Sequence, residues 1–202
     1  MHLLVLHTPK GGSGKSTLAR ELAVTADRAS VRAALADLDP QGTTTGWYRR
    51  RAAETPPLVR FNPSGPDDEL QDAGLDLLVV DTPPGTSSLI APLLRRSDVV
   101  LVPVRPTPDD LLGAAPIARS LAGKPWAFVL CQVPPRSRLL ASALRQLAAL
   151  GRVAPVHITF RADFPAAAIE GMAAAEFPGT KAAEESAALW DYARSLVDAP
   201  VD

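Results

Sequence analysis

The chain has 202 residues, 47% of them apolar, which is enough to bury the core of one domain but leaves too little for a second. Its formal net charge of −1 excludes a basic field over the whole surface, so any contact with nucleic acid must come from a local arginine patch. The single cysteine excludes an internal disulfide and a cysteine pair for zinc or an iron–sulfur cluster.

Short β-branched and leucine-rich runs alternate with longer segments rich in Ala, Leu and Arg, a pattern typical of parallel strands joined by crossover helices. In chain order, we predict strands at 3–7, 33–37, 77–81, 99–104 and 128–132, with a weaker one at 153–157. We predict helices at 15–29, 87–96, 108–121, 138–150, 164–174 and 181–197. The predicted fold class is α/β, a doubly wound, mainly parallel sheet with helices on both faces, and residues 1–202 are expected to form one domain.

The remaining segments carry no further domain or targeting signal. We expect the proline-rich stretch 55–66 to be an exposed excursion, because too little chain precedes it to fold alone. Residues 1–7 are too short for a signal peptide, and no run approaches the roughly 18 apolar residues of a membrane span. We therefore expect a soluble, cytoplasmic protein.

A glycine-rich segment at 10–17, Lys-Gly-Gly-Ser-Gly-Lys-Ser-Thr, lies between the first predicted strand and the first predicted helix. Its glycines permit positive φ and let backbone N–H groups approach a polyphosphate at the positive end of the helix. Lys15 is expected to reach the β- and γ-phosphates, and the hydroxyl of Ser16 to bind Mg²⁺. The sequence therefore predicts a P-loop in which the nucleotide is bound by Gly11, Gly12, Ser13, Gly14, Lys15, Ser16 and Thr17.

Two aspartates follow predicted strands and are expected at the same edge of the sheet. Asp81 ends an apolar strand, from which a carboxylate can hold Mg²⁺ beside the phosphates. Asp39 lies about 24 residues after Lys15, at the end of the next strand, where it can orient the attacking water and contribute to the metal site. Asp37 is left open between a structural role and one near the metal.

Three motifs in order resemble those of the ParA/MinD family of P-loop ATPases, which is defined by a deviant Walker A sequence. They are Lys-Gly-Gly-x-Gly-Lys-Ser at 10–16, Asp-Leu-Asp-Pro-Gln-Gly at 37–42 and Leu-Leu-Val-Val-Asp-Thr-Pro-Pro-Gly at 77–85. Pro9 stands where other P-loops have their first glycine. Segments 102–108 and 133–138 also resemble the short ParA-type partition ATPases, which lack an N-terminal helix-turn-helix, so the resemblance covers nearly the whole chain.

This resemblance implies a homodimer held together by ATP and Mg²⁺, with slow intrinsic hydrolysis that a partner stimulates. By the same resemblance, Lys10 contacts the nucleotide of the other subunit, like an arginine finger supplied in trans, and Asp39 is required for hydrolysis. The base is expected near Pro106, Thr107 and Pro108 and at the end of the next strand, where Cys131 stands in place of an asparagine found in many relatives. No guanine-specific element follows a strand, which favours ATP over GTP.

The function that this resemblance favours is DNA segregation, as an ATP-switched dimer stimulated by a centromere-binding or cargo-adaptor protein. Nonspecific DNA binding, and with it association with the nucleoid, would come from Arg136, Arg138 and Arg161, which could equally be ordinary surface charge. A positioning ATPase for a cargo other than DNA shares every motif.

Two other classes are less well supported. A MinD-like membrane-cycling regulator needs a basic amphipathic C-terminal helix, whereas residues 195–202 are acidic and interrupted by proline. We therefore expect no membrane partner. An iron–sulfur reductase on the same scaffold lacks its cysteines, and we find no substrate residues for a ligase.

Overall fold

Five parallel strands form one sheet in the computed structural model, which describes residues 1–65, 74–85 and 87–197. The strand order is β2-β3-β1-β4-β5. The strands are β1 (His2–Leu6), β2 (Ala33–Asp37), β3 (Leu77–Asp81), β4 (Val99–Val104) and β5 (Trp126–Leu130). Leu6 and Asp37 both lie in register with Asp81, so β1, β2 and β3 end at the same edge of the sheet.

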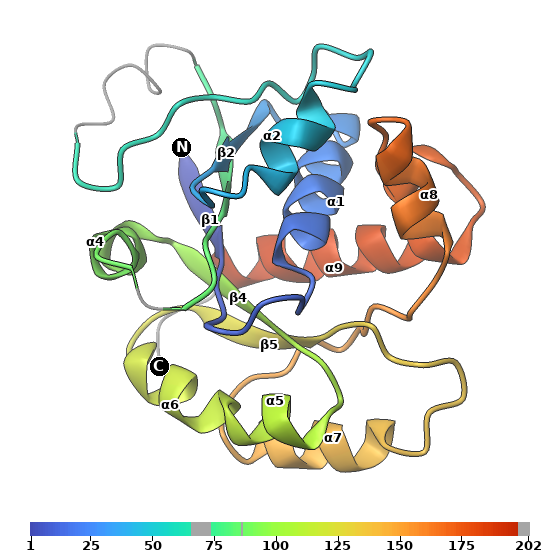
Figure 1. Ribbon diagram of the computed structural model, residues 1–202. Helices are drawn as coiled ribbons and strands as arrows, with labels where there is room; N and C mark the ends of the chain where they lie inside the picture. The colour runs from blue at the N-terminus through green and yellow to red at the C-terminus, as the bar shows by residue number, and fades with distance from the viewer. Residues whose placement is uncertain (66–73, 86, 198–202) are drawn as a thin grey trace.

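Helices cover both faces of this sheet. They are α1 (Lys15–Arg28), α2 (Thr43–Tyr48), α4 (Ile90–Arg96), α5 (Pro108–Leu112), α6 (Ala114–Ser120), α7 (Leu140–Ala148), α8 (Asp163–Ile169) and α9 (Lys181–Val197), with a 3₁₀ turn η1 (Ala174–Glu176) before α9. In Figure 1, α1, α8 and α9 lie on one side of the strands and α4, α6 and α7 on the other. This is the doubly wound α/β architecture that the sequence predicts.

Successive residues of each strand point to opposite faces, so every strand contributes to two cores. Leu4 and Leu6 of β1 pack with α1, α8 and α9, whereas Leu3 and Val5 pack with α4, α6 and α7. All four side chains are at most 5% exposed. Burial on both faces explains why the strands are continuous apolar runs rather than alternating ones.

Four predicted strands are confirmed to within one residue, β5 begins two residues early, and the sixth prediction is wrong. Residues 153–157 form only an isolated parallel bridge, between Val153 and Phe128. The Ala154 N–H donates to the Phe128 carbonyl, but the next bond to β5 comes from Ile158 rather than from residue 156. Pro155, with no N–H and a fixed φ, lies inside the bulge that breaks the ladder.

The helix predictions for α1 and α9 are confirmed. The predictions 87–96 and 138–150 extend two or three residues beyond α4 and α7, and the other two differ more. The segment 108–121 is two helices, because the ring of Pro116 would clash with the carbonyl of Leu112 in a continuous helix. The segment 164–174 stops being α-helical at Ile169; Gly171 follows at φ +68°, and a Cβ on it would lie 2.4 Å from the Arg50 backbone.

The sequence analysis missed α2, whose three threonines and one glycine have poor helix propensity. Tertiary contacts form it. The Asp37 carboxylate accepts from the Thr45 N–H at 2.7 Å, and the fully buried Trp47 donates to the Met172 carbonyl at 2.9 Å. Of the predicted excursion 55–66, residues 55–65 form no helix or strand of the structure, and residue 66 lies outside the described part.

Candidate functional site

The glycine-rich loop connects β1 to α1 at the carboxyl edge of the sheet. Gly12 and Gly14 adopt φ of +71° and +105°, a region that other L residues rarely enter. Gly14 is the N-cap of the 14-residue helix α1 and no side chain caps it, so the first N–H groups of the helix are free to bind an anion. The loop therefore has the backbone conformation of a phosphate cradle.

Lys15 folds back into this loop. Its ammonium donates to the carbonyls of Thr8, at 3.2 Å, and Lys10, at 3.1 Å, and the residue is 6% exposed. Burial lowers the pKa of Lys15, while the nearby charges of Asp81 and Asp39 raise it. A buried ammonium held only by two neutral carbonyls gains a stronger, charge-assisted partner when a polyphosphate enters the loop.

Asp81 is the fully buried carboxylate beside the loop. Its Oδ2 accepts from the Thr44 hydroxyl at 2.7 Å, whereas its Oδ1 has no hydrogen-bond partner within the described residues. Burial raises the pKa of Asp81 to about 6, and the hydroxyls of Ser16 and Thr44 offset part of that rise. A buried oxygen without a partner, next to the Ser16 hydroxyl, fits Mg²⁺ or one of its water ligands.

The two aspartates of the second motif have different surroundings. Asp37 accepts from the Thr45 N–H and hydroxyl at 2.7 and 2.8 Å and from the Asp39 N–H at 3.1 Å, so it acts as the cap of α2. The Asp39 carboxylate accepts only the N–H of Gln41, at 3.0 Å, among the described contacts, and it is half-buried. Asp39 is therefore the aspartate of this pair that is available for chemistry.

A pocket of about 250 Å³ adjoins the loop at Gly14 and Thr17. Asp39 and Asp81 do not line it, and its walls come from α1, from the segment after β5, and from residues before and at the start of α8. It is lined by Gly14, Thr17, Leu18, Cys131, Gln132, Ile158, Thr159, Phe160, Arg161, Phe164 and Pro165. An apolar hollow next to a phosphate cradle has the surroundings that a nucleoside requires.

Comparison with known proteins identifies the family of this chain. Residues 4–174 match the family described as the CobQ/CobB/MinD/ParA nucleotide binding domain. The chain belongs to this family of ParA/MinD-type P-loop ATPases. It is 33% identical over 195 residues to the maintenance of carboxysome distribution protein A of Gloeobacter kilaueensis, spanning 92% of this chain and 88% of that protein.

Two further comparisons describe the relatives of this ParA/MinD-type protein. It is 31% identical over 169 residues to the chromosome-partitioning ATPase Soj of Thermus thermophilus, covering 68% of this chain and 66% of Soj. The ATP complex of a McdA variant from Cyanothece shares its fold, with a TM-score of 0.74 over 99% of this chain and 97% of that one at 15% identity.

The signature lysine of the family motif, Lys10, is paired within its own chain. Its ammonium lies 3.3 Å from Asp110 of α5, whose side chain is 4% exposed. Arg105 binds the same carboxylate, with Nε 2.7 Å from Oδ2. Although burial disfavours its charge, Arg105 and Lys10 together lower the pKa of Asp110. The trans role of Lys10 therefore requires it to leave Asp110, and that role stays a prediction.

The residues expected at the base are only partly brought together. Cys131 lines the pocket, but its thiol faces the Val129 carbonyl at 3.4 Å and burial raises its pKa, so it offers a base no donor. Pro106–Pro108 do not line the pocket and begin α5 instead. The sequence analysis missed Gln132, whose φ of +52° and whose bond to the Gly12 carbonyl at 2.7 Å tie the pocket to the loop.

The three arginines expected to bind DNA do not share one environment. Arg161 pairs with Glu185 at 2.7 Å and lines the pocket, whereas Arg136 and Arg138 are exposed on the loop after β5. The unusual φ of +59° at Arg136 turns this loop sharply. Only Arg136 and Arg138 therefore keep the free surface position that the DNA hypothesis needs.

The raised pKa of Asp81 predicts that its negative charge lowers the stability of the metal-free protein. Because its charge is costly, the folded protein loses stability as pH rises from 3.8, the ordinary pKa of an aspartate, to about 6. In metal-free buffer at pH 7.5 we expect Asp81→Asn to raise the free energy of unfolding by about 1–2 kcal/mol, measured by urea denaturation, with little difference near pH 4. A less stable variant at pH 7.5 would contradict this account of Asp81.

Proposed function

We propose that residues 1–202 form a single-domain ATPase that binds ATP and Mg²⁺, dimerises around the nucleotide, hydrolyses it slowly and positions a cargo in the cell. The observation that carries this proposal is the group formed by Lys15, Asp39 and Asp81 at one edge of the sheet, where the charges of both aspartates act on the Lys15 ammonium. One cation for phosphate, one buried carboxylate for a metal and one accessible carboxylate for water are the parts that phosphoryl transfer needs.

The chemistry divides among these residues. Lys15 and the N–H groups of 11–17 would bind the β- and γ-phosphates, because they combine a buried cation with a helix N-terminus. Ser16 and Asp81 would hold Mg²⁺, which stabilises charge on the phosphates when bound. Asp39 would orient the attacking water, with a secondary contribution to the metal shell.

The nucleoside would occupy the pocket of about 250 Å³ beside Gly14 and Thr17. Thr17 is the last residue of the 10–17 motif and lies in the first turn of α1, so it would face the phosphate next to the ribose when Lys15 binds the outer phosphates. Backbone groups of 158–161 and the amide of Gln132 are the polar contacts available to a base there. Pro106–Pro108 do not line this pocket and would contact the base from outside it.

Dimerisation gives Lys10 a role that its own loop cannot. Two lysines on one loop would compete for the same phosphates, and Lys10 is turned toward Asp110 at the neighbouring strand exit. Release from Asp110 would let its ammonium reach the nucleotide of a facing subunit. ATP, with the added charge of the γ-phosphate, would favour this exchange more than ADP does.

We predict that Lys10→Ala binds ATP within about threefold of the wild type but loses most hydrolysis, by about 10²-fold or more. The reason is that Lys10 contributes charge to the partner's nucleotide rather than to its own. Calorimetric titration and a phosphate-release assay measure the two effects. Lys181→Ala is the matched control, because Lys181 is 69% exposed and pairs only with Glu184 among the described residues. Normal turnover by Lys10→Ala would contradict a role in trans.

Relatives with two different cargoes, carboxysomes and chromosomes by their names, support cargo positioning as the general function. DNA segregation is the specific function that we favour, with a centromere-binding or cargo-adaptor protein as the stimulating partner. A cargo other than DNA is the alternative, since the nucleotide site would be the same. For DNA segregation, nonspecific DNA would be the track on which the ATP dimer is held.

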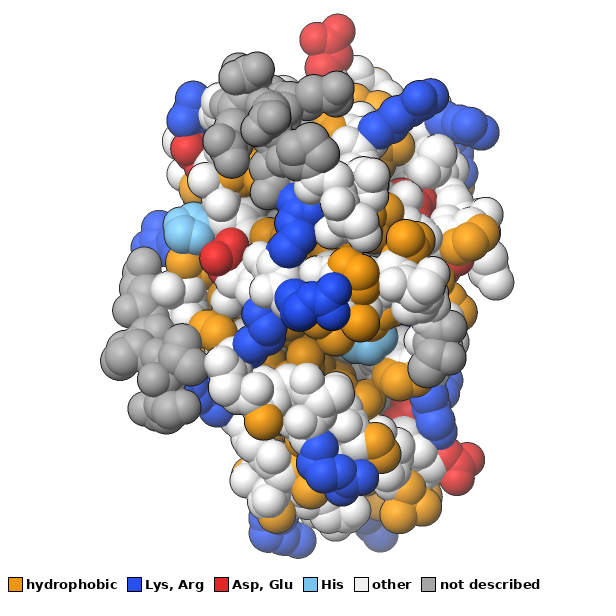
Figure 2. Space-filling view, turned by 90° about the vertical axis from the view of Figure 1, so that its left-hand side faces the viewer, with side chains coloured by type: hydrophobic (Ala, Val, Ile, Leu, Met, Phe, Trp, Pro, Cys, Tyr) orange, Lys and Arg blue, Asp and Glu red, His pale blue; other side chains and the backbone are white. Residues whose placement is uncertain are grey.

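Two surfaces are candidates for that DNA contact. One is the loop carrying Arg136 and Arg138. The other is the face over α4 and α6, where Figure 2 shows more Lys and Arg than Asp and Glu side chains. Arg95 of α4 is exposed there and, with Lys124, lines a hollow between the two helices.

We predict that the protein retains nonspecific duplex with ATP but only weakly with ADP, because a dimer contacts twice as many phosphates. Retention on immobilised DNA across a salt series measures this. Arg136→Ala/Arg138→Ala should lower affinity and flatten the salt slope, with Arg95→Ala/Arg119→Ala as the comparison pair on the other face. Equal retention with both nucleotides would count against a switch, and no retention would favour a cargo and track other than DNA.

A MinD-like membrane cycle has less support. No helix in the described ranges is long and apolar enough to cross a membrane. Leu189, Trp190 and Leu196 of α9 pack in the core with α1, so this apolar face is already used. Residues 198–202, part of the segment weighed above against this function, lie outside the described residues.

A further inference from the structure

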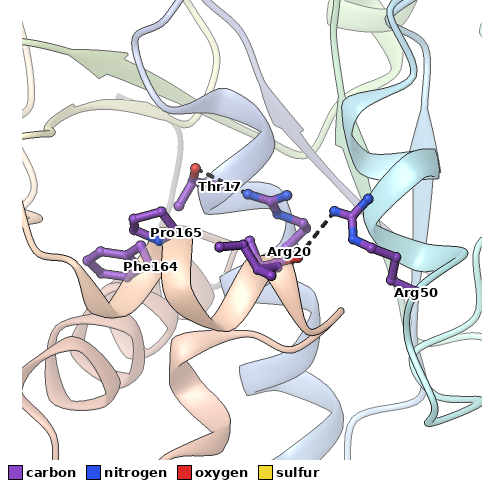
Figure 3. Close-up of a pocket in the computed structure, with 7 residues that line it drawn as sticks. Thr17, Arg20, Arg50, Phe164 and Pro165 are labelled. Carbon is purple, nitrogen blue, oxygen red and sulfur yellow. Dashed lines mark hydrogen bonds between the residues drawn. The ribbon is translucent and has the colours of Figure 1, made fainter.

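A second hollow, of about 520 Å³, lies on the other side of Thr17 from the base pocket. Thr17, Phe164 and Pro165 line both hollows. Figure 3 shows that the second one is bounded by α1, by the end of α2 and by α8. Its volume is within the range of small-molecule sites, roughly 300–1,000 Å³. Of the residues expected to bind the nucleotide, Thr17 lines it, whereas Lys15, Asp39 and Asp81 do not.

Arg20 of α1 provides the charge on the first wall. The residue is 8% exposed, yet its guanidinium has one hydrogen bond within the described part of the chain, a long one of 3.4 Å from Nη2 to the Thr17 hydroxyl. It has no carboxylate partner there either, and its plane lies 5.8 Å from the Trp47 ring centre. A guanidinium carries five N–H donors, so most of its hydrogen-bonding capacity is unused. A nearly buried cation in this condition calls for an anion.

Arg50, just after α2, brings a second cation to the same place. Its side chain donates to the carbonyls of Gly46 at 2.8 Å and Ala168 at 3.2 Å and pairs with no described carboxylate. In Figure 3 the two guanidinium groups face each other across the hollow. Burial lowers the pKa of Arg20 and the like charge of Arg50 adds to that effect, whereas the charges of Glu21, Asp81 and Asp37 raise it. Two cations that repel each other are both stabilised by one anion placed between them.

The opposite wall is apolar. It comes from α8 and consists of Phe164, Pro165, Ala168 and Ile169. Ile169 is 68% exposed, so a ligand in the hollow would cover part of an aliphatic side chain that now faces solvent. A ligand that filled the hollow would therefore bury apolar surface on one side and meet positive charge on the other.

We propose that this hollow binds a small anionic ligand, a phosphate or carboxylate on an apolar body, with its charge between Arg20 and Arg50 and its body against α8. A small molecule fits better than a polypeptide, because the strongest anchor, Arg20, is nearly buried in a hollow that opens to solvent between α1, the end of α2 and α8. The two hollows share Thr17, Phe164 and Pro165, but the anchors Arg20 and Arg50 are not residues of the proposed nucleotide site, so both sites can be filled at once.

The test is a calorimetric titration of the whole protein, saturated with ADP and Mg²⁺ so that the phosphate loop is occupied. The probes are phenylphosphate, phenylacetate and inorganic phosphate. We expect saturable one-to-one binding of at least one aromatic anion, at least about fivefold tighter than inorganic phosphate because the ring contacts α8. The tighter of the two aromatic anions identifies phosphate or carboxylate as the natural group.

Variants locate the binding. Arg20→Met keeps an aliphatic side chain against Trp47 and should weaken binding at least about tenfold, as should Arg50→Met at the exposed side. Arg49→Met is the matched control, since Arg49 is adjacent and exposed but does not line the hollow, and it should bind normally. If Arg20→Met fails to fold, Arg50→Met still decides the question.

Three results would overturn the proposal. They are the absence of saturable binding at millimolar probe, equal affinity for inorganic phosphate and the aromatic anions, and equal loss in Arg49→Met. Failure of ADP to bind would instead overturn the proposed function. In that case the same titration of the protein without nucleotide, read through Arg50→Met, still reports on this hollow alone.

Discussion

Lys15→Ala is expected to abolish measurable ATP binding. The Lys15 ammonium is the buried cation inside the loop, held at 3.1–3.2 Å by two carbonyls that a polyphosphate would replace. Losing charge-assisted bonds to two phosphates costs about 3 kcal/mol or more, which is roughly a hundredfold in affinity. Calorimetric titration with ATP and Mg²⁺ measures this loss directly.

The fold itself should tolerate Lys15→Ala. Burial lowers the pKa of Lys15, so the charge is not a source of stability, and we expect a change in the unfolding free energy within about 1 kcal/mol. Lys10→Ala is the control for the loop, because that lysine is bound to Asp110 outside the cradle. Unchanged ATP affinity in Lys15→Ala would mean that the nucleotide binds elsewhere.

Asp39→Ala is expected to bind ATP and dimerise but not to hydrolyse it. The Asp39 carboxylate accepts one hydrogen bond among the described contacts, from the N–H of Gln41, and lies near Lys15 at the strand exit. Lys15, Ser16 and Asp81 would already account for phosphate and metal, so removal should lower turnover by about 10²–10⁴-fold with little change in affinity. Single-turnover phosphate release measures hydrolysis, and sedimentation with ATP measures dimerisation.

Asp37→Ala separates catalysis from folding in the same motif. Because Asp37 accepts two hydrogen bonds from Thr45 of α2 and a third from the Asp39 N–H, its removal should lower the unfolding free energy by about 1–2 kcal/mol. Asp39→Ala should cost less than half of that. If Asp39→Ala loses ATP binding, Asp39 belongs to the metal shell or the fold. If it keeps full hydrolysis, another group orients the water.

The parts of the site that are local in sequence could be predicted. The loop, the strand before it and the helix after it are contiguous, and Asp81 ends a continuous apolar run whose position at the sheet edge follows from parallel topology. The doubly wound fold followed from the alternation of apolar runs and helical segments. These features depend on short-range spacing, which a sequence displays directly.

The parts that depend on long-range contacts could not be predicted. α2 forms because Asp37 and Met172 accept its hydrogen bonds, and no propensity within 43–48 indicates a helix. The base pocket is lined by Gln132 and by residues 158–161. Isolated bridges at the edge of the sheet, Phe128 with Val153 and Val133 with Thr159, bring the second segment beside the first. The pairing of Lys10 with Asp110 joins the segments that follow the neighbouring strands β1 and β4, which are far apart in the sequence.

Sedimentation of the wild type with a slowly hydrolysed ATP analogue, and separately with ADP, both with Mg²⁺, tests the central claim of a nucleotide-switched dimer most directly. The proposed function predicts a dimer with the ATP analogue and a monomer with ADP, because only the γ-phosphate draws Lys10 from Asp110 to the facing subunit. The same sedimentation coefficient with both nucleotides, at concentrations where calorimetry shows each to be bound, would contradict it.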